Sequence, residues 1–229
     1  MTRFVLVHSP FLGPSSWRGV AQALARAGHQ GDIAAYALAD APSQYEAAGE
    51  LIGSAIVAAP SPSILVTHSG AGALVPSIVH HTAAAAISGV LFVDSVLPRP
   101  GRSWFDTAPT IMAEHLLAKA SDGRLPPWND WYPHDPIGRL VSDPDERAEI
   151  LGELPRVPLA FLRAQAPAFA GWEGLPKAYL RLSKAYDGAA DRAAGKGWPV
   201  ERAALHHLAI ITEPDRVAAM LIDLSAGLK

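Results

Sequence analysis

Short apolar runs alternate with longer stretches of helical spacing along most of the chain. Residues 4–7 form an apolar run typical of a buried strand, and residues 16–27 have helical spacing that ends before Gly28. The same alternation predicts further strands at 32–38, 64–66, 90–93, 179–182 and 199–202, and further helices at 44–59, 71–80, 188–194 and 215–226. Strands of this length between helices predict an α/β fold, with a mostly parallel sheet covered by helices on both faces.

This alternation breaks in the middle of the chain. Residues 98–158 are rich in Pro and Trp, and helical spacing recurs there only at 110–120 and 144–154. About 60 residues with so few periodic segments would not readily form a core of their own. We therefore expect residues 1–229 to form one domain, with a helical lid insertion at about 99–157 over one edge of the sheet.

The composition argues against several classes of protein. Hydrophobic residues make up 49% of the chain and charged residues 18%, which predicts a folded core. The net charge of −3 and the lack of a basic run give no support for nucleic-acid binding, and the absence of cysteine excludes disulfides and thiolate metal sites. No apolar run approaches the roughly 20 residues of a membrane helix, and no export signal is apparent, so we expect a cytoplasmic protein without membrane contact.

The segment from Ile64 to Gly72 predicts a strand, a tight turn and a helix, with Ser69 at the turn. A serine there is lifted off the sheet, and the backbone N–H groups of the following helix can stabilise negative charge beside it. The usual pattern has glycine two residues before and after the serine, whereas this chain has Thr67 and Ala71. The alternative interpretation is a simple strand-to-helix connection in which Ser69 caps the helix.

A histidine pair lies where such a fold would supply a general base, after the last predicted strand and before the last predicted helix. His206 and His207 occupy this loop, and a neutral imidazole there could accept the proton of Ser69. The alternative is two ordinary loop histidines. The third residue of a triad would be a carboxylate after a strand, and both Asp94 and Asp187 qualify. We favour Asp94, while Asp187 is as consistent with a helix cap.

With these residues identified, the chain resembles the α/β-hydrolase superfamily over its whole length, and most closely its branch of small esterases and hydroxynitrile-lyase-like enzymes. The segments that carry the resemblance are 4–9, Trp17, 67–72, 92–98, and His207 with Pro214 seven residues later. The last spacing is usual in the family and selects His207 over His206. The segment around Asp94 also resembles haloalkane dehalogenases, which keep their catalytic acid after the corresponding strand. This similarity supports Asp94 as the third residue of the triad. The resemblance implies that the Gly70 N–H is one donor of an oxyanion hole.

One position departs from the family pattern. After the first strand the family has His-Gly followed by a residue whose N–H helps to bind the oxyanion, whereas this chain has Ser9 and then Pro10, which has no N–H. Losing one such donor typically costs about 10²–10³ in rate. Either Phe11 N–H or the Ser9 hydroxyl must replace it, or hydrolysis is slow, or the reaction forms no oxyanion. Hydroxynitrile-lyase-like relatives have a hydroxyl residue at the place of Ser9, so Ser9 is also a candidate substrate contact.

Aromatic residues of the insertion suggest the kind of substrate. Trp104, Trp128 and Trp131 would form an apolar pocket for a neutral, ring-containing molecule if the insertion covers the site, although they could also simply anchor it to the sheet. No phosphate-binding or dinucleotide-binding fingerprint is present, so we expect neither cofactor nor metal.

Three functions are compatible with these residues. The first is a serine hydrolase that cleaves an ester, thioester or lactone of a small apolar molecule through an acyl-enzyme. The second is a lyase or cyclase of small-molecule biosynthesis, in which Ser69 and His207 act as acid and base. The third is a silent binding protein, which has no physical need for an intact set of Ser, His and acid. The expected partner is a small-molecule substrate, and the chain is expected to be a monomer or a homodimer.

Overall fold

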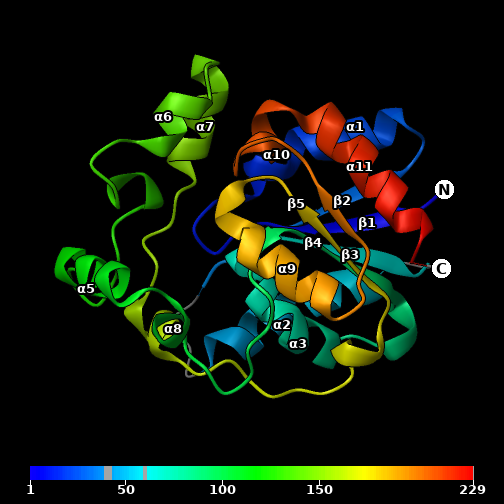
Figure 1. Ribbon diagram of the computed structural model, residues 1–229, viewed down its shortest axis with the longest axis horizontal. Coiled ribbons are helices and arrows are strands. Elements are labelled where there is room, and N and C mark those ends of the chain that lie inside the picture. The colour runs from blue at the N-terminus through cyan, green and yellow to red at the C-terminus, as the bar shows by residue number, and fades with distance from the viewer. Residues whose placement is uncertain (39–42, 59–60, 229) are drawn as a thin grey trace.

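The computed structural model describes residues 1–38, 43–58 and 61–228. Its centre is a sheet in the order β2-β1-β3-β4-β5-β6, and each pair of neighbouring strands is parallel. The strands are β1 (Arg3–Val7), β2 (Gln30–Ala34), β3 (Ser63–Ser69), β4 (Ile87–Ser95), β5 (Lys177–Arg181) and β6 (Val200–Arg202). The predicted α/β class with helices on both faces is confirmed (Figure 1).

Two hydrophobic cores lie on opposite faces of the sheet, as the two-residue period of a strand requires. Phe4 and Leu6 of β1 pack with α1 (Arg18–Arg26), α10 (Ala209–Thr212) and α11 (Pro214–Ala226). Val5 and Val7 point the other way, toward α2 (Gln44–Val57), α3 (Val75–His80) and α9 (Asp187–Gly195). Figure 1 shows α1 and α11 on one side of the strands and α2 and α3 on the other.

Short helices fill the stretch between β4 and β5. They are α4 (Trp104–Thr107), α5 (Thr110–Lys119), α6 (Pro136–Leu140), α7 (Pro144–Gly152) and α8 (Leu159–Arg163). In Figure 1 these helices lie beside the sheet, and α5 and α6 reach furthest from it. Their buried side chains join the same two cores: Leu116 lies in the core that contains Val5 and Val7, and Ile150 lies in the core that contains Phe4 and Leu6. The action of this stretch as a lid stays a prediction.

The sequence pattern located long elements better than short ones. The helices predicted at 110–120 and 215–226 are found as α5 and α11 within one residue at each end. By contrast α4, α6, α8 and α10 have four or five residues, which is too short for a helical period to be visible. The strand predicted at 32–38 begins earlier and ends at Ala34, and the end of the helix predicted at 44–59 falls outside the described residues.

The parallel topology gathers the ends of β1, β3 and β4 at one edge of the sheet. Because β1 and β4 both pair with β3, the segment after Val7 and the residues Ser69 and Asp94 emerge side by side. This edge is where ligands bind in open α/β sheets. Across the described ranges, no helix is both long and apolar enough to cross a membrane.

Candidate active site

Ser69 occupies a strained turn between β3 and the short helix η2 (Gly70–Leu74). Its backbone has φ 56° and ψ −124°, a conformation that non-glycine residues rarely adopt and that persists only when the surroundings enforce it. Two donors hold its carbonyl oxygen, the Val96 N–H at 2.9 Å and the Ser95 hydroxyl at 2.7 Å. The residues that follow Asp94 on β4 therefore fix the turn that carries Ser69.

The position at this turn that requires glycine is Gly72, and not position 67 or 71, where the family pattern has glycine. A Cβ at Gly72 would overlap the Val96 carbonyl oxygen and lie 2.5 Å from Ser95 Oγ, so only glycine fits there. Thr67 and Ala71 are fully buried, and Thr67 Oγ1 lies 3.5 Å from Ser95 Oγ. The missing glycines at positions 67 and 71 thus do not prevent the turn from forming.

His207, which is partly exposed, pairs with the buried Asp94. His207 Nδ1 lies 2.9 Å from Asp94 Oδ2, and the Asp94 side chain is fully buried. Asp94 also accepts hydrogen bonds from the Leu182 N–H at 2.7 Å, the Ser183 N–H at 2.9 Å and the Ser183 hydroxyl at 2.5 Å. Burial alone would raise the pKa of Asp94, but the hydrogen bonds from His207 and Ser183 outweigh it and hold the pKa below its usual range. Asp94 is therefore an ionised partner that orients the imidazole.

The alternative residues are engaged elsewhere. Asp187 forms ion pairs with Arg181 at 2.8 Å and Arg202 at 3.5 Å. It is the first residue of α9, but the N-cap is Tyr186 and no side chain caps the helix, so the cap interpretation is wrong. Its hydrogen-bond and ion-pair partners do not include His207. The neighbouring His206 places its Nε2 3.1 Å from Thr212 Oγ1, so it is not the histidine held by Asp94.

The His207 ring is stacked between two other rings. Tyr186 lies almost parallel to it, with centroids 4.9 Å apart and an interplanar angle of 7°, and His68 lies on it at 4.5 Å and 28°. Burial, together with the neighbouring His207, lowers the pKa of His68 to about 3, so His68 is neutral. It can therefore donate its Nε2 proton to the His207 carbonyl oxygen at 3.0 Å. These contacts fix both the ring and the backbone of His207.

Tyr186 is a site residue that the sequence reading missed. Its hydroxyl lies 3.2 Å from Ser69 Oγ, and this is the hydrogen bond that the Ser69 side chain makes among the described residues. Burial raises the pKa of Tyr186, so the phenol stays protonated. Its position just beyond the end of β5, directly before Asp187, was the available signal, because sites form at this edge of the sheet.

Pro10 stands beside Gly70, where the family resemblance places an oxyanion hole. A Cβ on Gly70 would lie 3.1 Å from Pro10 Cδ, so the proline ring covers the place where another residue would offer its N–H. The Phe11 N–H is directed to Ser9 Oγ at 3.2 Å. Because that Oγ is an acceptor in this bond, the hydroxyl proton of Ser9 remains available. Ser9 and Ser69 line one small recess together with Phe11, Trp128 and His207.

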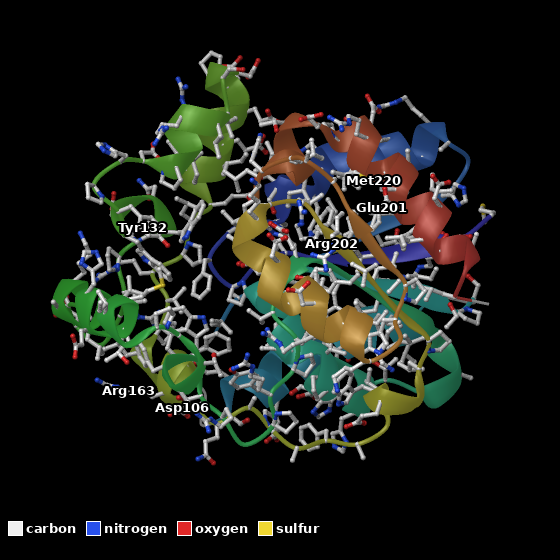
Figure 2. The ribbon with its side chains drawn as sticks, viewed as in Figure 1. Asp106, Tyr132, Arg163, Glu201, Arg202 and Met220 are labelled. Atoms are coloured by element: carbon white, nitrogen blue, oxygen red, sulfur yellow. The ribbon has the colours of Figure 1, made fainter. Side chains whose placement is uncertain are left out.

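A cavity of about 690 Å³ opens over Ser69 and His207. Its walls include Phe11, Gly70 and the three expected tryptophans, Trp104, Trp128 and Trp131. Tyr132, which also lines it, lies on the stretch between α5 and α6 (Figure 2). Trp131 is almost fully buried and donates its indole N–H to the Pro126 carbonyl at 2.9 Å, so it both anchors the insertion and forms a wall. Within the described ranges, no cluster of side chains could hold a metal ion.

Solved structures share this architecture at low sequence identity. No protein-family model and no curated protein sequence matches the chain. An extracellular alpha/beta-hydrolase from a Paenibacillus species is similar over 98% of this chain and 99% of its own, at 18% identity and a TM-score of 0.79. A pyrethroid hydrolase from Sphingobium faniae covers 98% and 97% at 16% identity, with a TM-score of 0.71.

A third similarity is to a protein whose name describes a synthase. Tomato methylketone synthase I, solved with 2-tridecanone, covers 100% of this chain and 99% of its own at 15% identity, with a TM-score of 0.69. Identities this low indicate a shared architecture and not a shared reaction. The parallel sheet, the serine turn and these similarities together show that the chain has the α/β-hydrolase fold.

Proposed function

We propose that the protein is a serine hydrolase that cleaves an ester, thioester or lactone, with Ser69 as nucleophile, His207 as base and Asp94 as the acid that orients it. The observation that carries the proposal is the 2.9 Å contact between His207 and the buried Asp94, beside a serine on a strained turn in the same cavity. The structural neighbours named as hydrolases are consistent with this reaction.

The proton path follows from the imidazole geometry. Nδ1–H donates to Asp94, which leaves Nε2 as the acceptor for the Ser69 proton. Ser69 Oγ then bonds to the acyl carbon, the bond to the leaving alcohol or thiol breaks, and His207 returns the proton to that group. Water attacks the acyl-enzyme by the same route, giving its proton to His207, which passes it to Ser69. Hydrogen bonds to the base are often long without substrate, so the present contact of Ser69 with Tyr186 is compatible with this path.

Two donors can stabilise the tetrahedral oxyanion. Gly70 is the first residue of η2, and the first N–H groups of a helix have no partner within it. The second donor is the Ser9 hydroxyl, which replaces the N–H that Pro10 lacks. The Phe11 N–H polarises it by donating to its oxygen. The Ser9 hydroxyl therefore takes the place of a backbone N–H as a donor in the recess that it lines together with Ser69.

A fluorophosphonate probe tests the proposal directly, because it labels only serines activated as nucleophiles. We expect one adduct per chain, located at Ser69 by peptide mass spectrometry, and none on heat-unfolded protein. Failure of the folded protein to react, under conditions in which a known serine esterase is fully labelled, would overturn the proposal.

Ser9→Ala is expected to lower kcat for a p-nitrophenyl ester by about 10²-fold, with a smaller change in KM, because one of two oxyanion donors is lost. Both kcat and KM are measured from the steady-state or stopped-flow absorbance of the released nitrophenolate. Pro10→Ala supplies a backbone N–H beside Gly70 and should restore at least part of the lost rate when combined with Ser9→Ala. Unchanged kcat in Ser9→Ala would exclude this hydroxyl as an oxyanion donor.

Tyr186→Phe is expected to lower kcat about tenfold and leave KM within about threefold. In the proposed mechanism the phenol donates to Ser69 Oγ, 3.2 Å away, and so directs the serine proton toward His207. Phenylalanine would keep the ring stacking on His207. The rate of probe labelling should fall by the same factor as kcat. Tyr45→Phe, which removes the hydroxyl of a buried tyrosine on α2 that does not line this cavity, is the matched control and should change neither quantity.

A second candidate is a non-hydrolytic lyase or synthase on the same residues. The observation that favours it is Pro10 against Gly70, because a reaction without a tetrahedral oxyanion does not need the missing N–H. In that reaction His207 would move the proton and Ser69 would hold the substrate without forming an ester.

A further inference from the structure

A smaller pocket of about 130 Å³ adjoins the catalytic cavity. The two share a wall formed by Val96, Arg99, Trp104, Thr107 and Arg192. Arg99 follows β4 beyond Asp94, and Arg192 lies on α9, so two elements that frame the catalytic residues bring their guanidinium groups to this wall. A substrate bound at Ser69 therefore has these two arginines within the same space.

The wall is positively charged and has no counter-charge. Arginine is the only charged residue type among the described residues lining either space, and Arg102 adds a third in the smaller pocket. Arg102 donates to the Asp106 carbonyl oxygen at 3.2 Å. Among the described residues, neither the Arg99 side chain nor the Arg192 side chain makes a hydrogen bond or an ion pair, and Arg99 bonds only through its backbone carbonyl, which accepts the Arg102 N–H. The chain as a whole carries a net charge of −3, so this concentration of positive charge is local.

Nearby carboxylates are already committed to other groups. Asp187 and Asp191 on α9 pair with Arg202, and Asp106 caps α4 by accepting the Ser103 N–H at 2.7 Å. Arg192 Nη1 lies 3.7 Å from the place of a Cβ on Gly188, so its guanidinium runs back along α9 over a residue of the cavity wall. Partial burial and the charges of Arg192 and Arg102 lower the pKa of Arg99, which indicates that these cations are close enough to repel one another.

We infer that Arg99 and Arg192 form a subsite for an anionic group of the substrate, a carboxylate or a phosphate, while the bond to be cleaved lies at Ser69. This inference rests on the proposed function, since it names the class of ester or thioester that the site accepts. Guanidinium groups bind carboxylate and phosphate through paired, charge-assisted hydrogen bonds, and uncompensated cations are what such a group requires. It also modifies the sequence-based expectation of a neutral substrate: the tryptophans hold the apolar part, and the arginines hold an anionic end.

Three matched esters test the inference. They are p-nitrophenyl hexanoate, the mono-p-nitrophenyl ester of adipate, which carries a carboxylate in place of the terminal methyl group, and the corresponding phosphonate. We expect the enzyme to prefer one of the anionic esters by at least about tenfold in kcat/KM, and the better of the two identifies the anion. The preference should decline as salt is added, since both arginines are exposed to solvent.

Variants locate the effect. Arg99→Gln and Arg192→Gln should each lower kcat/KM for the preferred anionic ester about tenfold, mainly through KM, and leave the neutral hexanoate within about twofold. Arg163→Gln is the matched control, because Arg163 on α8 lies at the outer edge of the molecule (Figure 2) and lines neither pocket. Labelling by the fluorophosphonate should be normal in all three. Equal kcat/KM for neutral and anionic esters, with labelling intact, would overturn only the inference of an anionic subsite. Absence of labelling in the unmodified protein would overturn the proposal that it is a serine hydrolase.

Discussion

Ser69→Ala is expected to lower kcat for a p-nitrophenyl ester by at least about 10⁴-fold, because it removes the atom that forms the acyl-enzyme. The residual rate should reflect binding and oxyanion donors alone. Alanine has the same Cβ as serine and so the same strain at φ 56°, and the carbonyl contacts to Ser95 and Val96 do not involve the side chain. The variant should therefore fold, with a thermal unfolding midpoint within a few degrees of the unmodified protein.

The same variant separates the two candidate reactions. In the hydrolase, His207→Ala should produce a loss similar to that of Ser69→Ala, because the nucleophile and its base act as one unit. In a lyase, Ser69→Ala would mainly raise KM, since the serine would only hold the substrate, while His207→Ala would still abolish turnover. Retention of a tenth or more of kcat in Ser69→Ala would thus favour the lyase and contradict the acyl-enzyme.

The arrangement of the sheet was predictable because its four central strands, β1, β3, β4 and β5, repeat one signal, whereas the edge strands β2 and β6 are more polar and less buried. Strands buried on both faces appear as short apolar runs, and long helices show their period, so element order and parallel topology follow. Parallel topology in turn places the ends of β3 and β4 side by side, which is why Ser69 and Asp94 could be selected from sequence. Their catalytic roles, and that of His207, stay predictions until variants are measured.

The rest of the site depends on contacts that a sequence pattern does not carry. Tyr186 reaches Ser69 from the turn after β5, and its ring position depends on stacking against His207. Arg99 and Arg192 are far apart in the chain and meet only because the segment after β4 passes α9. Ordinary exposed arginines are common, so their lack of partners becomes visible only in three dimensions.

Asp94→Asn is expected to lower kcat/KM by about 10⁴-fold through the tautomer of His207. The asparagine oxygen can still accept from the Leu182 and Ser183 N–H groups, which places its amide NH₂ toward Ser183 Oγ and His207 Nδ1. An NH₂ can only donate, so Nδ1 must become the acceptor and Nε2 must carry the proton. A protonated Nε2 in a neutral ring cannot accept the proton of Ser69.

Asp187→Asn provides the comparison that assigns the acid. Asp187 is about half exposed and pairs with the largely buried Arg181 and with the exposed Arg202. An exposed pair such as the second contributes at most about 1 kcal/mol to stability. Its replacement should leave kcat/KM within about threefold. Both variants should be compared by steady-state kinetics and by thermal unfolding, so that loss of activity is not mistaken for loss of fold. A large loss in Asp187→Asn with little change in Asp94→Asn would reverse the assignment, and small effects in both would mean that no carboxylate orients His207 during the reaction.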